Sequence, residues 1–236
     1  MGLAHSPSIV TDGLVLCVDA ANTKSYPGSG TTWTDISGKG HNGTLINGPT
    51  FSSDNMGGIV FDGSNDAVTL SANSDFDFGT GNFTIDGFAN YNSGNFRTLV
   101  CSEHYYASGY NGNWIIRVTN TGALAFASYD GQSNEEYSEF SITITSNKWF
   151  YFAFVREGTG SNECKFYFNG VLVGSTTVSK SLSNAGNEGL RIGQDLDGPN
   201  NNFLGKISNV KIYKGKGLTA TEVLQNYNAN KGRFGL

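Results

Sequence analysis

The sequence predicts an all-β protein: a two-sheet antiparallel sandwich with one short helix near the C-terminus. Aromatic and β-branched segments recur between clusters of turn-forming residues along the whole chain. Gly contributes 32 of the 236 residues and Pro only 4. Gly tolerates the backbone conformations that tight turns need, so this composition suits many short strands.

The predicted strands are separated by turn clusters such as 26–31, 37–43 and 158–162. Strands at this spacing are typical of a sandwich or a barrel, and a single domain is the simpler interpretation. In chain order we expect strands at 14–19, 58–61, 67–70, 82–91, 97–102, 114–119, 123–128, 140–145, 149–156, 165–168, 171–178, 190–192 and 203–213.

Two of these strands indicate where they lie in a sheet. Residues 149–155 are apolar at every position, which predicts a strand in the middle of a sheet with both faces covered. In the predicted strand at 82–91, Phe83 and Ile85 alternate with Thr84 and Asp86. We therefore expect one face of this second strand to pack and the other to face water.

The last third of the chain carries a hairpin signal and a helix signal. The Asn-Gly dipeptide at 169–170 lies between two strand candidates and predicts a type I′ turn. Thr219 followed by Glu222 forms a capping box and predicts the start of a short helix. Val223 and Tyr227 then share one helix face, which we expect to pack on the sandwich.

Charge and cysteine usage narrow the function classes. The net charge is −5 with no block of basic residues, so a nucleic acid or a membrane surface is not the expected partner. Cys17, Cys101 and Cys164 are scattered, odd in number and without a zinc-type spacing, which predicts buried free thiols. No signal-peptide pattern is visible at the start, so we expect synthesis in the cytoplasm.

Several segments occur in an order that resembles one known family. They are WTDISGKGHNGT at 33–44, FDGSND at 61–66, FTI at 83–85, the Trp-to-Arg strand at 149–156, the Asn-Gly hairpin, LRIG at 190–193, the segment 203–213 and LTATE at 218–222. This order is similar to that of laminin-G-like domains of the concanavalin A-like jelly rolls. The resemblance covers residues 12 to 229 and implies a jelly-roll domain at 13–229, an N-terminal arm at 1–12 and a C-terminal tail at 230–236.

The resemblance also suggests functions. Such domains occur in adhesins, in glycan-binding modules and in structural proteins of tailed phages, and the segments 12–15, 20–30 and 226–234 look most like the phage versions. The first interpretation is a non-enzymatic virion structural protein, in the capsid decoration or the tail. It would contact other virion proteins or copies of itself, with host-surface adhesion as an added role. The alternative is a carbohydrate-binding module, and a glycosidase is a distant third.

A sugar-binding surface needs an aromatic platform beside polar groups. The candidates for glycan contact are Tyr105, Tyr106, Tyr110, Trp114 and Tyr129. The competing interpretation places the same rings in the core, because aromatic residues of a two-faced sandwich usually lie there.

Catalysis by a retaining glycosidase needs two carboxylates on one strand face. Glu135 and Glu139 have the right parity but follow a polar loop, and we interpret them as a solvated edge. We therefore expect no catalytic residue and no enzyme activity.

Calcium is the cofactor that the resemblance raises. Many members of the family hold a structural Ca²⁺ with an Asp in the closing strand, where this chain has Ser208 and Asn209. The missing carboxylate argues against a site there, since Ca²⁺ prefers carboxylate among its oxygen ligands. The remaining candidate metal ligands are Asp62, Asp66, Asp195 and Asp197, with solvated Asx turns as the alternative. We expect no cofactor.

Overall fold

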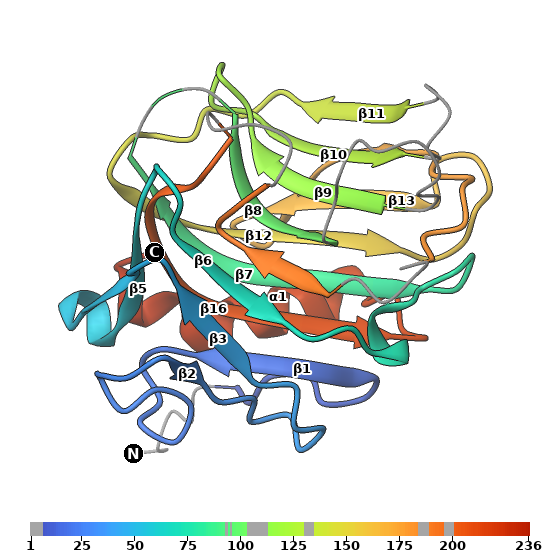
Figure 1. Cartoon of the computed structure of the whole chain (residues 1–236). Coiled ribbons are helices and arrows are strands. Elements are labelled where there is room, and N and C mark those ends of the chain that lie inside the picture. The colour runs from blue at the N-terminus through green and yellow to red at the C-terminus, as the bar shows by residue number, and fades with distance from the viewer. Residues whose placement is uncertain are drawn as a thin grey trace, which may run out of the picture.

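The computed structural model describes residues 7–92, 94, 96–102, 113–129, 135–183, 189–195 and 201–236. Two antiparallel sheets of eight strands each face one another (Figure 1). Sheet A runs β14 (Val171–Thr176), β13 (Cys164–Phe168), β12 (Lys148–Arg156), β7 (Phe83–Tyr91), β16 (Leu204–Lys214), β5 (Gly58–Asp62) and β4 (Thr50–Ser52), and β1 (Leu14–Asp19) also pairs with β16. Sheet B runs β11 (Glu135–Phe140), β10 (Leu124–Tyr129), β9 (Asn113–Val118), β8 (Arg97–Ser102), β15 (Leu190–Ile192), β6 (Ala67–Leu70), β3 (Gly43–Ile46) and β2 (Thr32–Trp33).

The main core lies between the two sheets. Phe126 of β10 stacks on Phe154 of β12 with the ring centroids 4.0 Å apart, so the two sheets meet through aromatic rings. Trp114 of β9 lies in the same layer, 5.7 Å from the ring of Phe78. The predicted all-β sandwich is therefore confirmed, including β12 as an interior strand that is buried on both faces.

A second apolar layer covers the outer face of sheet A. Helix α1 (Ala220–Asn230) starts with the predicted capping box at Thr219 and lies behind β7 and β16 in Figure 1. The 3₁₀ helix η3 (Lys231–Phe234) follows it. Phe234 stacks on Phe88 of β7 at 4.5 Å, and Val223 is fully buried in the same cluster.

The cover over sheet A corrects one prediction. Thr84 and Asp86, expected to face water, are both fully buried because the C-terminal segments pack over this face of β7. The Asp86 carboxylate instead forms an ion pair with Lys211 Nζ at 2.9 Å and accepts a hydrogen bond from Asn226 Nδ2 at 2.7 Å. A buried carboxylate requires such partners, so this polar cluster fixes α1 on the sheet.

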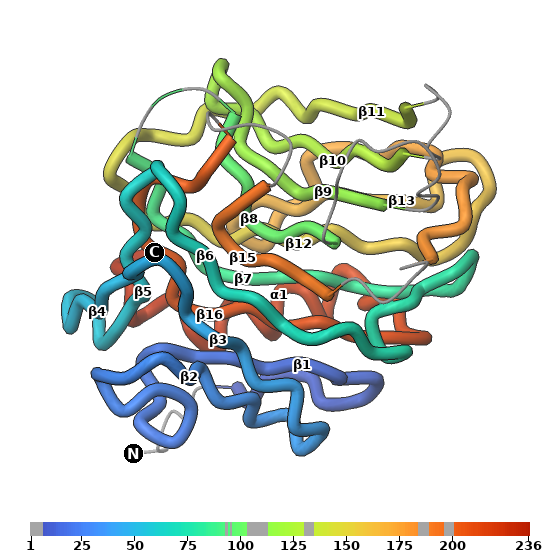
Figure 2. Tube along the Cα trace, viewed as in Figure 1, coloured from blue at the N-terminus to red at the C-terminus, as the bar shows by residue number. Residues whose placement is uncertain are grey.

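The two segments expected to be an arm and a tail pack on the domain over the residues that the structure describes. The backbone N–H of Val10 donates to Asn226 Oδ1 at 2.8 Å. At the other end, Phe234 is only 7% exposed and its ring lies 4.6 Å from that of Trp149. Figure 2 shows the C-terminus near β5 of sheet A. Val10 and Phe234, which belong to these two segments, thus contact the domain.

Most predicted strands are present, with four differences. The short strands β2, β3 and β4 were not predicted, because they are rich in Thr, Ser and Gly and are held by their neighbours in the sheets. A strand was predicted at 140–145, whereas β11 runs Glu135–Phe140 and forms the edge of sheet B through its pairing with β10.

The predicted hairpin at Asn169-Gly170 is confirmed. Both residues have positive φ, 49° and 80°, as a type I′ turn requires. A Cβ at Gly170 would come within 2.9 Å of the ring of Tyr227, so the hairpin tip lies close against α1. The three cysteines are buried and free, as predicted. Among the described residues, no helix is both long and apolar enough to cross a membrane.

Candidate functional site

The outer face of sheet B carries a surface of polar and aromatic side chains. On β9 and β10 the even-numbered residues belong to the core, so the odd-numbered residues point outward. The same parity holds on β11, where Phe140 is in the core. The strand pairings then place one row on this face across all eight strands: Thr32, Thr44, Thr69, Arg191, Cys101, Ile115, Ala127 and Tyr137. The three central members, Cys101, Ile115 and Ala127, are buried, so the exposed part of this face lies toward β11.

Arg117 is the centre of the more aromatic part of this face. Its guanidinium carbon lies 4.5 Å from the ring centroid of Phe96, just before β8, and 5.4 Å from that of Tyr137 on β11. β8 and β11 lie on opposite sides of β9, so the two rings restrain the Arg117 side chain from both directions. A guanidinium over an aromatic ring is an attractive pair that also keeps the ring oriented.

Two tyrosine–carboxylate pairs lie on this face, one at the register of Arg117 and one four residues further along the strands, at the register of Asn113. The Tyr129 hydroxyl donates to Glu135 Oε1 at 3.0 Å, and the Tyr137 hydroxyl donates to Glu139 Oε2 at 2.8 Å. Tyr137 is 40% exposed, and both glutamates are exposed. We refer to the surface formed by Phe96, Arg117, Tyr129, Glu135, Tyr137 and Glu139 as the Tyr137 face.

Two groups on the Tyr137 face, Glu139 and Tyr137, have shifted pKa values. Hydrogen bonds from Tyr137 and Thr121 lower the pKa of Glu139, which is therefore a carboxylate at neutral pH. Partial burial and the Glu139 carboxylate raise the pKa of Tyr137 to about 12, which keeps its hydroxyl protonated. The surface thus presents ionised acceptors, a fixed cation and tyrosine rings.

The two glutamates do not have the geometry of a glycosidase pair. β11 carries them four residues apart, which is about 13 Å at 3.3 Å per residue. Retaining enzymes hold their carboxyl groups about 5 Å apart, and inverting enzymes about 6.5–9.5 Å apart. A general acid also needs a raised pKa, whereas the pKa of Glu139 is lowered. This surface suits binding through stacking and hydrogen bonds. The expectation of a solvated edge is confirmed, since β11 is an edge strand.

The structure separates the predicted aromatic residues. Tyr129 lies on the outer face, half-buried, within the Tyr137 face. Trp114 lies in the core with 1% of its surface exposed, so it offers no ring to a ligand, and this corrects its place among the glycan candidates. Trp114 is an even-numbered residue of β9, and the even-numbered side chains of this strand point between the two sheets. Tyr105, Tyr106 and Tyr110 lie outside the described residues.

Asp62 and Asp66 form a closed turn. Asp62 Oδ1 accepts from the backbone N–H of Ser64 at 2.7 Å, and Asp66 Oδ2 accepts from the backbone N–H of Asp62 at 2.9 Å. Burial raises the pKa of Asp66. The Asx-turn alternative accounts for both residues, because each carboxylate accepts a backbone N–H of its own loop.

The second acidic loop is described only in part. Asp195 is 7% exposed and accepts a hydrogen bond from Asn201 Nδ2 at 3.3 Å, whereas Asp197 lies outside the described residues. Within the part of the chain that the structure describes, no group of three or more His, Cys, Asp or Glu residues could hold a metal ion.

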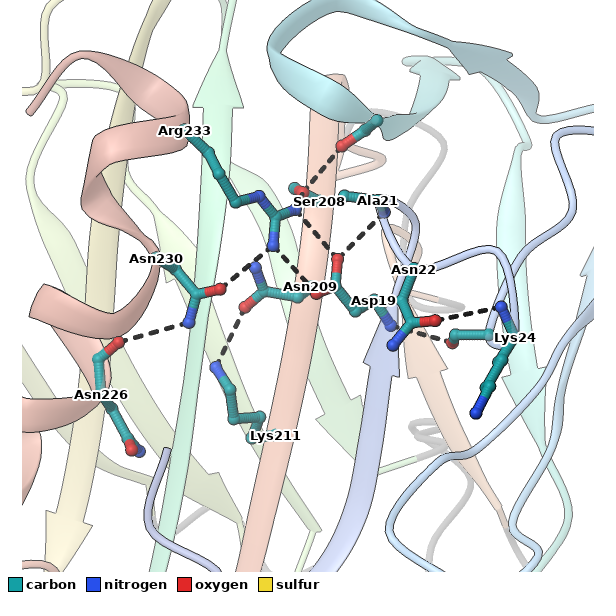
Figure 3. Close-up of polar contacts among 12 residues, drawn as sticks. Asp19, Ala21, Asn22, Lys24, Ser208, Asn209, Lys211, Asn226, Asn230 and Arg233 are labelled. Carbon is teal, nitrogen blue, oxygen red and sulfur yellow. Dashed lines mark hydrogen bonds and ion pairs between the residues drawn. The ribbon is translucent and has the colours of Figure 1, made fainter. Parts of the chain in front are cut away.

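Ser208 and Asn209, at the position of the missing carboxylate, have partners within the chain (Figure 3). Ser208 Oγ donates to the carbonyl of Gly57 at 2.7 Å and accepts from Arg233 Nη2 at 2.8 Å. Asn209 Oδ1 accepts from Lys211 Nζ at 3.1 Å. Two side-chain cations therefore already contact the oxygens at this position.

Reasoning from the sequence missed Phe96, Arg117 and Tyr137 as site residues. Tyr137 could have been found from the sequence, because it lies two residues from both Glu135 and Glu139. Side chains two residues apart in a strand lie on the same face. No local signal identified Arg117, because its ring partners come from β11 and from the residue before β8.

The two packed antiparallel sheets and the order of their strands are those of a jelly roll of the concanavalin A type. The family model described as the concanavalin A-like lectin/glucanases superfamily matches residues 62–224, and the chain belongs to this family, within its laminin G group. The predicted resemblance is confirmed at this level. No curated protein matches the chain.

Solved structures with this fold include whole domains and parts of larger ones. Domain 4 of AbnA, an extracellular arabinanase from Geobacillus stearothermophilus in complex with arabinotriose, has a TM-score of 0.66 and 18% identity over 91% of this chain and 98% of its own. The binding domain of Paraclostridial Mosquitocidal Protein 1 has a TM-score of 0.72 and 18% identity, covering 93% of this chain and 52% of its own. The receptor binding domain of botulinum neurotoxin D has a TM-score of 0.69 and 17% identity over 92% and 52%. The chain spans about half the length of the toxin domains that it matches, and these likenesses show the fold.

Proposed function

We propose that this chain is a non-catalytic carbohydrate-binding module whose ligand lies on the Tyr137 face. The observation that carries the proposal is the arrangement of Tyr137, Arg117 and Glu139, in which an exposed ring is held by a cation and an ionised carboxylate. Sugar recognition combines an apolar face that stacks on a ring with hydroxyls that need donors and acceptors. The Tyr137 face offers both on a rigid sheet.

Preorganisation favours binding on this surface. Tyr137 has its hydroxyl bound to Glu139 and its ring against Arg117, so little side-chain freedom is lost when a ligand stacks on it. Glu139 is restrained in turn by the hydroxyl of Thr121 at 2.8 Å. The arabinanase domain supports the proposal, because it has the same fold over nearly its whole length and is named as a complex with arabinotriose.

The test is a glycan array followed by calorimetry on the glycans that bind. We expect Tyr137→Ala to weaken binding at least tenfold, which corresponds to about 1.4 kcal/mol. Tyr137→Phe keeps the ring and loses the bond to Glu139, so its loss should be smaller. Val171→Ala on β14 of sheet A is the matched control and should bind as the unaltered protein does. The proposal would be contradicted if the protein bound no glycan on the array, or if Tyr137→Ala bound with the same affinity as the unaltered protein.

A structural role in a tailed-phage virion is the second proposal. It is favoured by an exposed apolar patch where the end of β14 meets helix α1, with Val171, Leu172 and Leu224 65%, 50% and 44% exposed. Such a patch is typical of protein–protein contact. The partners would be other virion proteins or copies of this chain, in the capsid decoration or the tail.

Two measurements test the virion proposal. Neighbouring genes that encode capsid, portal or tail proteins would support it, and a neighbourhood of polysaccharide-degrading enzymes would contradict it. Self-association is measured by light scattering over a range of concentrations, with Leu172→Asp expected to abolish any oligomer and Lys39→Asp as the control.

A further inference from the structure

We infer that the Tyr137 face selects neutral glycans and discriminates against carboxylated or sulfated ones. The inference rests on the proposed carbohydrate-binding function and specifies the chemical class of its ligand. It follows from where the charges lie around the one ring on β11 that is open to solvent.

β11 places a carboxylate on each side of Tyr137. Glu135 and Glu139 each lie two residues away on the same outward face, which corresponds to about 7 Å along the strand. Both are exposed. A sugar that stacks on Tyr137 therefore lies between two carboxylates, each within the Debye length of about 8 Å at physiological salt.

Arg117 offsets only one of these two charges. The next cation on the outward row is Arg191, four strands away from Tyr137, which is about 19 Å at 4.8 Å per strand. Screening removes most of its effect at that distance. The surroundings of Tyr137 thus carry a net negative charge, as does the whole chain at −5. An anionic sugar would meet like charge during both approach and docking.

The same carboxylates are suitable partners for a neutral sugar. Glu139 accepts the hydroxyls of Tyr137, Thr121 and Thr119. Among the described residues, Glu135 accepts only the Tyr129 hydroxyl. An ionised carboxylate has about four acceptor positions, so Glu135 retains the capacity to accept sugar hydroxyls. A hydroxyl donates to these positions, whereas an ionised carboxylate or sulfate on the ligand has no proton to donate.

The experiment compares polymers that share the sugar ring and the linkage and differ at C6, where the neutral polymer has a hydroxymethyl group and the acidic polymer a carboxylate. Two matched pairs with the same linkage within each pair are used: mannan and polymannuronate, and glucan and polyglucuronate. Affinity is measured for the full chain, for Glu135→Gln and for Asp12→Asn, a control at the start of β1 in sheet A. We expect the neutral member of any pair that binds to be preferred at least about fivefold, and the preference to shrink with added salt. Glu135→Gln should reduce the preference, and Asp12→Asn should not.

The outcomes separate the two proposals. Equal or stronger binding of an acidic polymer would overturn the inference and leave the carbohydrate-binding proposal intact. A preference that Glu135→Gln does not change would also overturn it, because the discrimination would then come from other groups. If no polymer of either kind binds and the glycan array is silent, the carbohydrate-binding proposal fails, and the inference fails with it.

Discussion

The Arg233 guanidinium donates two hydrogen bonds to the Asp19 carboxylate, although 214 positions separate the two residues in the chain (Figure 3). Nη1 lies 2.9 Å from Oδ2, and Nη2 lies 2.9 Å from Oδ1. Nη2 also donates to Ser208 Oγ on β16. A two-point arginine–carboxylate pair has a fixed geometry as well as charge. It ties η3 to the end of β1 and holds Phe234 over the outer face of sheet A.

Removing this contact should destabilise the domain. The Arg233 and Asp19 side chains are 13% and 19% exposed, so solvent screens the pair only in part. We expect Arg233→Ala to lower the free energy of unfolding by about 1.5–3 kcal/mol, the range for hydrogen bonds to charged groups. Arg233→Lys keeps the charge but not the two-point geometry and should lose about half as much. Urea titration followed by tryptophan fluorescence measures both, with Lys39→Ala as the control. A change below about 0.5 kcal/mol for Arg233→Ala would contradict the expectation that this pair stabilises the domain.

Calcium removal should leave stability unchanged. Ser208 Oγ already has two partners within the chain, and the Asp62 and Asp66 carboxylates accept backbone N–H groups of their own turn. The thermal midpoint is measured in EDTA and in millimolar Ca²⁺. A rise of several degrees with Ca²⁺ would contradict the expectation and would direct attention to the loop that contains Asp195 and Asp197.

Removing only one partner of the buried ion pair between Lys211 and Asp86 should lower the free energy of unfolding strongly. Their side chains are 3% and 0% exposed. Lys211→Met leaves an uncompensated buried carboxylate and should cost about 3–5 kcal/mol. The double variant Lys211→Met with Asp86→Asn removes both charges, so it should recover much of this loss. Urea denaturation of Lys211→Met, Asp86→Asn and the double variant in parallel tests the prediction. Additive losses would show that the two groups are not energetically coupled.

The buried thiols should make the domain less stable at high pH. Burial raises the pKa of Cys17 and of Cys164 from 9.0 to about 11. Between these values the folded thiols keep their protons while those of the unfolded chain lose theirs, so stability is present below pH 9 and falls from pH 9 to 11. The slope is at most about 1.4 kcal/mol per pH unit for each thiol. Urea midpoints at pH 8, 9 and 10 measure it, and a Cys17→Ala, Cys164→Ala variant should show a shallower fall. An identical fall in that variant would assign the effect to other groups.

The sequence by itself was sufficient for the fold class, the interior strand β12, the hairpin at Asn169-Gly170 and the capping box at Thr219. Each of these depends on residues that are close in the chain. The period of apolar residues in a strand, the positive φ of a turn and the hydrogen bonds of a helix cap all depend on residues within a few positions of one another. A short stretch of sequence is therefore enough to predict them.

Tertiary structure alone decided which side chains form the Tyr137 face. Arg117 is oriented by rings from β11 and from the residue before β8, and the face that Trp114 occupies depends on the register between β9 and its neighbours. It also decided that Asp86 is buried, because α1 and η3 cover β7 from the far end of the chain. A one-residue change of register exchanges the two faces of a strand, so neither burial nor grouping is encoded within the strand itself.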